Sequence, residues 1–218
     1  MARRSIVAVI GLGRFGTAIA LELEREDTEV LGIDSDPERV DEVAGRLTHA
    51  AVADSTNAEA LQQLSVQDSD RAVVGIGTDI EASILTVSAL DGFGIPLIWA
   101  KAISEAHARI LRQVGAHHVV RPEHDMGLRV AHLVRGRMLD FIEFDDDYAM
   151  VKTRPPKSIV NLSLRESQVR RLYDVTVVGL KRPGSGFEYA TPETFVAEND
   201  ILIVAGKITD TERFSELT

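Results

Sequence analysis

The chain has a glycine-rich loop near its start, Gly11-Leu12-Gly13-Arg14-Phe15-Gly16. An apolar run, Ile6 to Ile10, precedes this loop, and a stretch with helical periodicity, Thr17 to Arg25, follows it. A G-x-G-x-x-G pattern between a strand and a helix is typical of a Rossmann-like fold that binds a nucleotide. The first glycine allows the turn, the second lets a phosphate approach the backbone, and the third brings the helix close to the strand. The N–H groups and positive dipole end of the helix then attract the phosphates.

A second apolar run, Glu29 to Ile33, ends at Asp34, roughly 20 residues after the loop, where a carboxylate can accept hydrogen bonds from ribose hydroxyls. Later strands of the pattern also end in polar or small residues. The candidate nucleotide-binding residues are Gly11, Leu12, Gly13, Arg14, Phe15, Gly16, Asp34, Ser35, Asp54, Ser55, Gly77, Thr78 and Lys101.

From Ile6 to about Pro122, apolar strands alternate with amphipathic helices. Asp36 and Pro37 are typical of a helix start, and Thr56 to Glu59 read as a capping box. Strands that are buried on both faces and joined by helices predict a doubly wound parallel sheet. Ligands of such sheets bind at the carboxyl ends of the strands, where the candidate residues lie.

The pattern changes after Pro122. Residues 125–138 form one amphipathic stretch whose apolar stripe is Met126, Val130, Leu133, Val134 and Met138. The stripe packs on its own domain, or the helix is a crossover that exchanges contacts between two subunits. An acidic edge then follows, either a solvated loop or a cation site, made of Glu143, Asp145, Asp146 and Asp147.

Residues beyond 140 predict a small α+β module that is too small to be stable alone and is therefore expected to dimerise. A short helix is expected near Leu164 to Leu172. We expect three parts: a nucleotide-binding domain over 1–122, a crossover and dimerisation helix over 123–140, and a ligand-binding, dimerising C-terminal domain over 141–218.

Composition excludes several classes of protein. The formal net charge of −10 argues against a nucleic-acid partner held by long-range attraction. The absence of cysteine excludes disulfides, thiol nucleophiles and thiolate metal sites. No apolar run approaches the about 18 residues of a membrane span, and Met1 to Arg4 lead into a strand without a signal peptide. A cytoplasmic protein without direct membrane insertion is expected.

The sequence shows little that predicts catalysis. His107 and His132 fall in amphipathic helices, where surface or interface positions are expected, and adjacent His117 and His118 would face opposite sides of a strand. No nucleophile elbow or Walker loop is present. Near Glu123-His124-Asp125, Asp125 is a plain helix N-cap, or Glu123 reaches a nucleotide phosphate through a divalent ion. We expect a protein that is not an enzyme.

Arg14 is an informative residue within the loop. A guanidinium beside the phosphates makes bidentate, charge-assisted bonds, and it suits the terminal charge of ADP or ATP better than the internal phosphates of a dinucleotide. Lys101 would assist from the next strand end. The alternative is that Arg14 points to solvent or to a neighbouring subunit.

These segments closely resemble the cytosolic regulators of Ktr/Trk potassium uptake systems. The resemblance is carried by Val9 to Gly16, Leu31 to Asp34, Ile98 to Ala102 and Pro122 to Gly127. It implies two "regulator of conductance of K+" (RCK) domains, and homodimers that assemble into an octameric ring. It also implies docking on an integral-membrane potassium channel subunit of the KtrB/TrkH type. ATP would activate and ADP inactivate, with Arg14 at the terminal phosphate, Asp34 at the ribose and Glu123 at a divalent cation, Mg²⁺ or Ca²⁺.

The resemblance further implies that cyclic di-AMP inactivates the system by binding the C-terminal domain. The matching residues are Ile159, Val160, Asn161, Leu164 and Arg165, with Ile159 and Val160 on adenine and Arg165 on phosphate. These two apolar residues would equally suit a dimer core. The chain departs from the family afterwards, because Arg170 to Tyr173 replace the usual glycine-containing turn.

A different class of function fits the same loop. The chain would then be a small NAD(H)-binding oxidoreductase or an NADH redox sensor. Asp34 argues against NADP, because a carboxylate repels a 2′-phosphate.

Overall fold

The computed structural model describes residues 5–135, 137–145 and 147–218. It contains two compact units, which divide between Glu123 and His124. The expected helix over 125–138 includes Gly136 and the acidic edge includes Asp146; these positions, like residues 1–4, lie outside the described residues.

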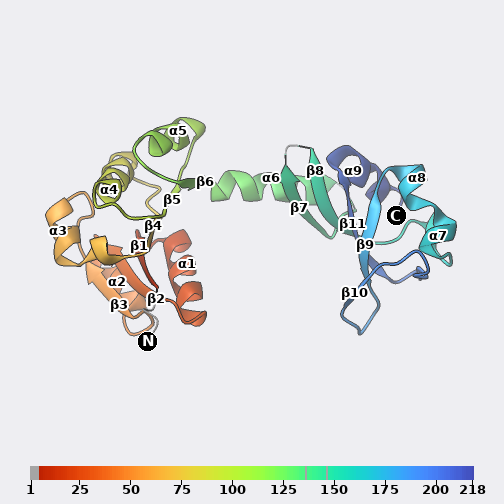
Figure 1. Cartoon of the computed structure of the whole chain (residues 1–218), viewed down its shortest axis with the longest axis horizontal. Coiled ribbons are helices and arrows are strands. Elements are labelled where there is room, and N and C mark those ends of the chain that lie inside the picture. The colour runs from red at the N-terminus through yellow and green to blue at the C-terminus, as the bar shows by residue number, and fades with distance from the viewer. Residues whose placement is uncertain (1–4, 136, 146) are drawn as a thin grey trace. The chain divides into compact units, whose positions relative to one another are not determined.

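The first unit contains a six-stranded parallel sheet in the order β3-β2-β1-β4-β5-β6 (Figure 1). Its strands are β1 (Ile6–Ile10), β2 (Glu29–Asp34), β3 (His49–Val52), β4 (Arg71–Val74), β5 (Ile98–Lys101) and β6 (His118–Val120). The predicted doubly wound sheet is confirmed. Because the strand order reverses between β1 and β4, the carboxyl ends of these two strands flank the crevice where such sheets bind ligands.

Helices cover both faces of this sheet. Their bounds are α1 (Arg14–Arg25), α2 (Pro37–Val43), α3 (Ala58–Gln63), α4 (Ile80–Gly92) and α5 (Glu105–Gln113), with a 3₁₀ turn η1 (Val66–Asp68). Side chains of α1 and α2 share one apolar core with the sheet, and those of α3, α4 and α5 share the other. The two cores fix the sheet between two layers.

Side-chain caps begin most of these helices. Backbone N–H groups of α2, α3, α4 and α5 donate to the caps Asp36, Asn57, Asp79 and Ser104. The predicted capping box at Thr56 is wrong, because the Thr56 hydroxyl donates to Asp54 and leaves the cap to Asn57.

The start of α1 differs from these capped helices. The helix begins at Arg14, earlier than predicted, and its N-cap is Gly13, which has no side chain to accept a hydrogen bond. The first turn also carries no acidic residue. The positive end of the α1 dipole is therefore left for another group to neutralise.

Two glycines allow α1 to approach the end of β1. Gly11 has a φ of +92°, a conformation that side chains disfavour. A Cβ atom on Gly16 would lie 1.9 Å from the Gly11 carbonyl oxygen. Gly13 is different, because its φ is −70° and a Cβ there would have no atom of the described residues within 4 Å. Internal packing thus requires the first and third glycines of the loop but not the second.

Helix α6 (Pro122–Arg135) links the two units in sequence. It begins before Asp125, so the alternative in which Asp125 is a helix N-cap is wrong. Leu133 packs on the core of the second unit, whereas Met126, Val130 and Val134 are exposed. Contact of this stripe with a second subunit stays a prediction.

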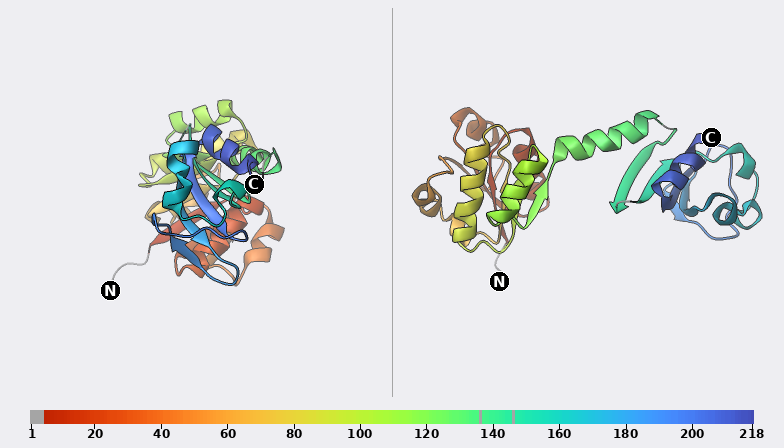
Figure 2. Two further views of the ribbon diagram at one scale, coloured as in Figure 1. Left: turned by 90° about the vertical axis from the view of Figure 1, so that its right-hand side faces the viewer. Right: turned by 90° about the horizontal axis from the view of Figure 1, so that it is seen from above.

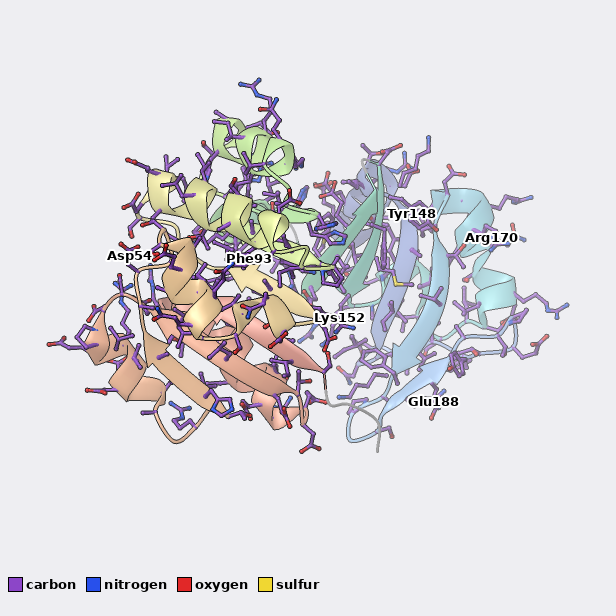
Figure 3. The ribbon with its side chains drawn as sticks, turned by 60° about the vertical axis from the view of Figure 1, so that its left-hand side comes forward. Asp54, Phe93, Tyr148, Lys152, Arg170 and Glu188 are labelled. Atoms are coloured by element: carbon purple, nitrogen blue, oxygen red, sulfur yellow. The ribbon has the colours of Figure 1, made fainter. Side chains whose placement is uncertain are left out.

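The second unit is a small α+β module, as predicted, and Figure 2 shows it from two further directions. Its five-stranded antiparallel sheet has the order β10-β9-β11-β8-β7. Its strands are β7 (Asp140–Asp145), β8 (Tyr148–Thr153), β9 (Thr176–Lys181), β10 (Phe187–Tyr189) and β11 (Ile201–Lys207). Its helices are η2 (Lys157–Ile159), α7 (Leu164–Ser167), α8 (Val169–Tyr173) and α9 (Ile208–Glu216). Residues Tyr148 and Lys152 of β8 are labelled in Figure 3.

Two local predictions for this unit are wrong. The acidic edge is not a loop throughout, because Glu143 lies within β7, which pairs with β8. The single short helix is broken at Gln168, whose φ of +49° separates α7 from α8.

We predict that Gly16→Ala destabilises the first unit by about 3 kcal/mol, because the new Cβ would overlap the Gly11 carbonyl oxygen. Gly13→Ala is the matched control and should change the free energy of unfolding by less than about 1 kcal/mol. Urea unfolding followed by circular dichroism measures both. Equal stability of the two variants would contradict this account of the loop.

Candidate functional site

Asp34 connects β2 to the glycine loop. One carboxylate oxygen accepts the Leu12 N–H at 2.6 Å, and the other accepts the Asp36 N–H at 2.9 Å. The Arg39 guanidinium lies 3.4 Å from the first of these oxygens. With only 6 % of its surface exposed, Asp34 therefore fixes the shape of the loop in addition to any contact with a ribose.

Charged side chains gather beside the start of α1. The Lys101 ammonium at the end of β5 lies 2.6 Å from a carboxylate oxygen of Glu123, the second residue of α6. The same ammonium lies 5.7 Å from the centre of the Phe15 ring. Lys101 also runs past Gly77, where an added Cβ would lie 3.2 Å from the lysine Cε.

Electrostatics place Arg14 in this cluster as well. The Lys101 hydrogen bond lowers the pKa of Glu123 below its ordinary value, and the positive charge of Arg14 adds a smaller lowering effect. Lys101 thus pairs with the Glu123 carboxylate, and the exposed Arg14 acts on the same carboxylate through its charge. The cluster carries a net positive charge at the uncapped start of α1, which is the arrangement that attracts a phosphate.

The remaining predicted residues of this unit have varied surroundings. Asp54, labelled in Figure 3, accepts the N–H and hydroxyl of Thr56, which lowers the pKa of its carboxyl group. Ser55 is buried and its hydroxyl accepts a hydrogen bond from Thr86 of α4 at 2.8 Å, so it is held inside the unit. Ser35 and Thr78 are exposed.

Sequence reasoning missed two residues that shape the site. Arg39 reaches Asp34 from α2, and its position in the first helical turn after Asp34 was an available signal. A Cβ at Gly75 would lie 2.9 Å from the Gly11 carbonyl oxygen, so the end of β4 also supports the loop. The signal for Gly75 was a glycine at the end of the strand beside β1.

The predicted metal ligand, Glu123, is paired with Lys101. Among the residues that the structure describes, no group of three or more histidine or acidic side chains is placed to hold a metal ion. A divalent ion at Glu123 would need oxygen ligands from a nucleotide or from another chain. The metal site stays a prediction.

The residues predicted to bind cyclic di-AMP lie around η2 and α7. Ile159 is 1 % exposed and belongs to the core of its own unit, so it is not available to an adenine in this conformation. Val160 and Leu164 are partly buried, and Asn161 is exposed with a φ of +63°. The exposed guanidinium of Arg165 pairs with Glu193 and lowers the pKa of that carboxyl group.

One histidine lies elsewhere than expected. His107 of α5 is 2 % exposed within this chain, so the expectation of a surface or interface position is wrong. Burial lowers the pKa of its imidazole, which favours the neutral form. Its Nδ1 atom accepts the Ile103 N–H at 3.4 Å.

Comparison with protein families matches both units. The TrkA-N domain matches residues 7–122, and the TrkA-C domain matches residues 148–218. The chain is 36 % identical over 210 residues to the Ktr system potassium uptake protein C of Bacillus subtilis (strain 168), covering 96 % of this chain and 95 % of that protein. It is also 36 % identical over 208 residues to the Ktr system potassium uptake protein A of that organism, covering 95 % and 94 %.

Solved structures share the fold. The GsuK RCK domain superposes with a TM-score of 0.68 at 16 % identity, over 98 % of this chain and 48 % of that one. The GsuK channel bound to NAD superposes with a TM-score of 0.66 at 15 % identity, over 99 % of this chain and 39 % of that one. GsuK bound to ADP superposes with a TM-score of 0.50 at 16 % identity, over 58 % of this chain and 33 % of that one. This chain therefore spans about half or less of the length of these structures.

The match to full-length potassium uptake proteins confirms the expectation that the chain is a transport component and not an enzyme. Among the described residues, no helix has the length and apolar character needed to span a bilayer. The chain belongs to the family of Ktr potassium uptake proteins, as a regulatory subunit with a TrkA-N and a TrkA-C (RCK) domain.

Proposed function

We propose that this chain binds ATP and ADP at the start of α1 and uses the difference between them to regulate a membrane potassium channel subunit of the KtrB/TrkH type. The observation that carries the proposal is an uncapped helix start that begins with Arg14 and lies beside the ion pair of Lys101 with Glu123. A terminal phosphate would be stabilised by the charges of both cations. The internal phosphates of a dinucleotide carry less negative charge and would therefore bind these cations more weakly.

Lys101 gives the ligand a route to the rest of the chain. A phosphate that binds Lys101 competes with Glu123, which belongs to the first turn of α6. The released carboxylate then joins the phosphate oxygens around Mg²⁺ or Ca²⁺. ATP and ADP differ in how well they drive this exchange, and a ligand shifts a conformational equilibrium only through such differential binding.

Assembly follows the same proposal. The exposed apolar residues of α6 provide a surface for a second copy, consistent with a homodimer in which residues 123–140 act as the crossover. Such dimers form an octameric ring on the cytoplasmic face of the membrane, held there by the channel subunit. ATP favours the conducting state of the channel and ADP favours the inactive state.

NAD(H) is the second candidate ligand, because a structural neighbour is the GsuK channel bound to NAD. Asp34 places a buried carboxylate at the end of β2, which is the position of the acidic residue that binds the ribose in dinucleotide-binding folds. In that case the chain senses NADH and not the number of terminal phosphates.

Cyclic di-AMP is proposed as a ligand of the second unit. Arg165 supports this, since its guanidinium is exposed and would exchange Glu193 for a phosphate. Val160 provides the partly exposed apolar contact, and the buried Ile159 supports the pocket from the core.

We predict that Arg14→Ala weakens ATP binding about ten-fold more than ADP binding, because one charge-assisted bond to the terminal phosphate is lost. Arg25→Ala, at the other end of α1, is the control and should leave both affinities unchanged. Melting temperatures measured against ATP, ADP and NADH report the affinities. Equal losses of affinity for ATP and ADP would contradict the role of Arg14 at the terminal phosphate. A rise in melting temperature with NADH alone would favour NAD(H) as the ligand instead.

Lys101→Met should raise the pKa of Glu123 toward its ordinary value, which NMR of the side-chain carboxyl measures. Because the folded-state pKa is lowered, the pair stabilises the fold above the unfolded-state pKa and this contribution disappears as pH falls through the folded-state pKa. Lys207→Met removes a lysine of the second unit that lies 3.7 Å from Asp147 and serves as the control. An unchanged Glu123 pKa in Lys101→Met would contradict the assigned pairing.

Arg165→Ala should reduce cyclic di-AMP binding by about ten-fold or more in calorimetry while ATP binding persists. Arg182→Ala, which removes an exposed arginine near Glu188, is the matched control. Undiminished binding in Arg165→Ala would exclude the site.

A further inference from the structure

His132 joins α6 to α9 within the second unit. Its Nδ1 atom lies 2.8 Å from a carboxylate oxygen of Glu212, a residue 80 positions later in the chain. The two side chains are 25 % and 22 % exposed, so water partly screens their contact but does not surround it. The pair is therefore a tertiary contact between two helices.

A ring contact fixes the geometry of this pair. The His132 imidazole stacks on the Phe141 ring of β7, with ring centres 4.2 Å apart and planes at 17°. Phe141 is buried in the core of the second unit. The imidazole is thus held against the core on one side while its nitrogen reaches Glu212, and it loses little rotamer freedom when the pair forms.

Described charged side chains on the same elements form ion pairs of their own. Asp140, next to Phe141 on β7, pairs with Arg129, which lies one turn before His132 on α6. On α9, Arg213 pairs with Asp210. Among the described side chains, Glu212 is the charged group in contact with the imidazole.

We propose that His132 and Glu212 form a proton-sensitive latch that holds α6 against the second unit. Histidine is the side chain that ordinarily changes charge between about pH 5 and 8. With a protonated imidazole the contact is a charge-assisted ion pair, and with a neutral imidazole it is a hydrogen bond donated by the ring. The latch is therefore stronger at acidic pH and weaker at alkaline pH.

The latch adjoins an open groove between α6 and β7. This groove has a volume of about 460 Å³, and its lining includes Leu128 and Arg129 of α6 and Phe141 and Ile142 of β7. Phe141 is shared, since it lines the groove and also stacks on His132. A weaker latch lets α6 move from β7 and widens the groove, so the exposed apolar surface of α6 responds to pH without any nucleotide.

Amide hydrogen exchange of α6 in the full-length, nucleotide-free chain tests the latch. After correction for intrinsic exchange, protection of α6 should fall about two- to five-fold from about pH 6 to about pH 8. Glu212→Gln keeps the shape of the side chain but removes its charge, and should make protection independent of pH. Glu216→Gln removes an equal charge from an exposed position on the same helix and should behave as the unmodified chain.

His132→Asn is a second variant, which removes the imidazole and should also abolish the pH dependence of protection. Constant protection of α6 across this range in the unmodified chain would overturn the proposal. The same pH dependence in Glu212→Gln or His132→Asn as in the unmodified chain would assign the effect to another group and would also overturn it.

Discussion

The contact between α1 and the carbonyl group of Gly11 is the constraint on which the first unit depends. It requires a residue without a side chain at Gly16, and it places the start of α1 directly after β1. Asp34 then holds the loop from the neighbouring strand through the Leu12 N–H. With the loop fixed at both sides, the unneutralised end of the helix dipole has a defined position, and the cations at Arg14 and Lys101 act at that position.

Much of this arrangement was predictable because the signals are local. The glycine spacing, the apolar runs and the position of Asp34 follow from turn chemistry and strand periodicity, which act over a few residues. The pairing of Lys101 with Glu123 was not predictable in the same way, since the two residues are 22 positions apart. Each had been assigned to the site separately, but only the folded sheet brings β5 and the start of α6 together.

Errors arose where tertiary contacts override a local pattern. The acidic residues near β7 suggested a loop, yet pairing with β8 makes part of that segment a strand. Thr56 matched a capping box, but Asp54 accepts its hydroxyl. In each case the competing partner lies outside the local motif, or a neighbouring residue within it has the better geometry.

The pairing of Lys101 with Glu123 has a consequence for selectivity. Without ligand, the lysine is already satisfied by a carboxylate of the same chain, so an incoming anion must offer more than one negative charge to gain from replacing it. Singly charged anions such as chloride, bicarbonate and monocarboxylates do not meet this condition. In the function proposed above, Glu123 therefore competes with the ligand for Lys101, and an anion of low charge leaves the ion pair intact.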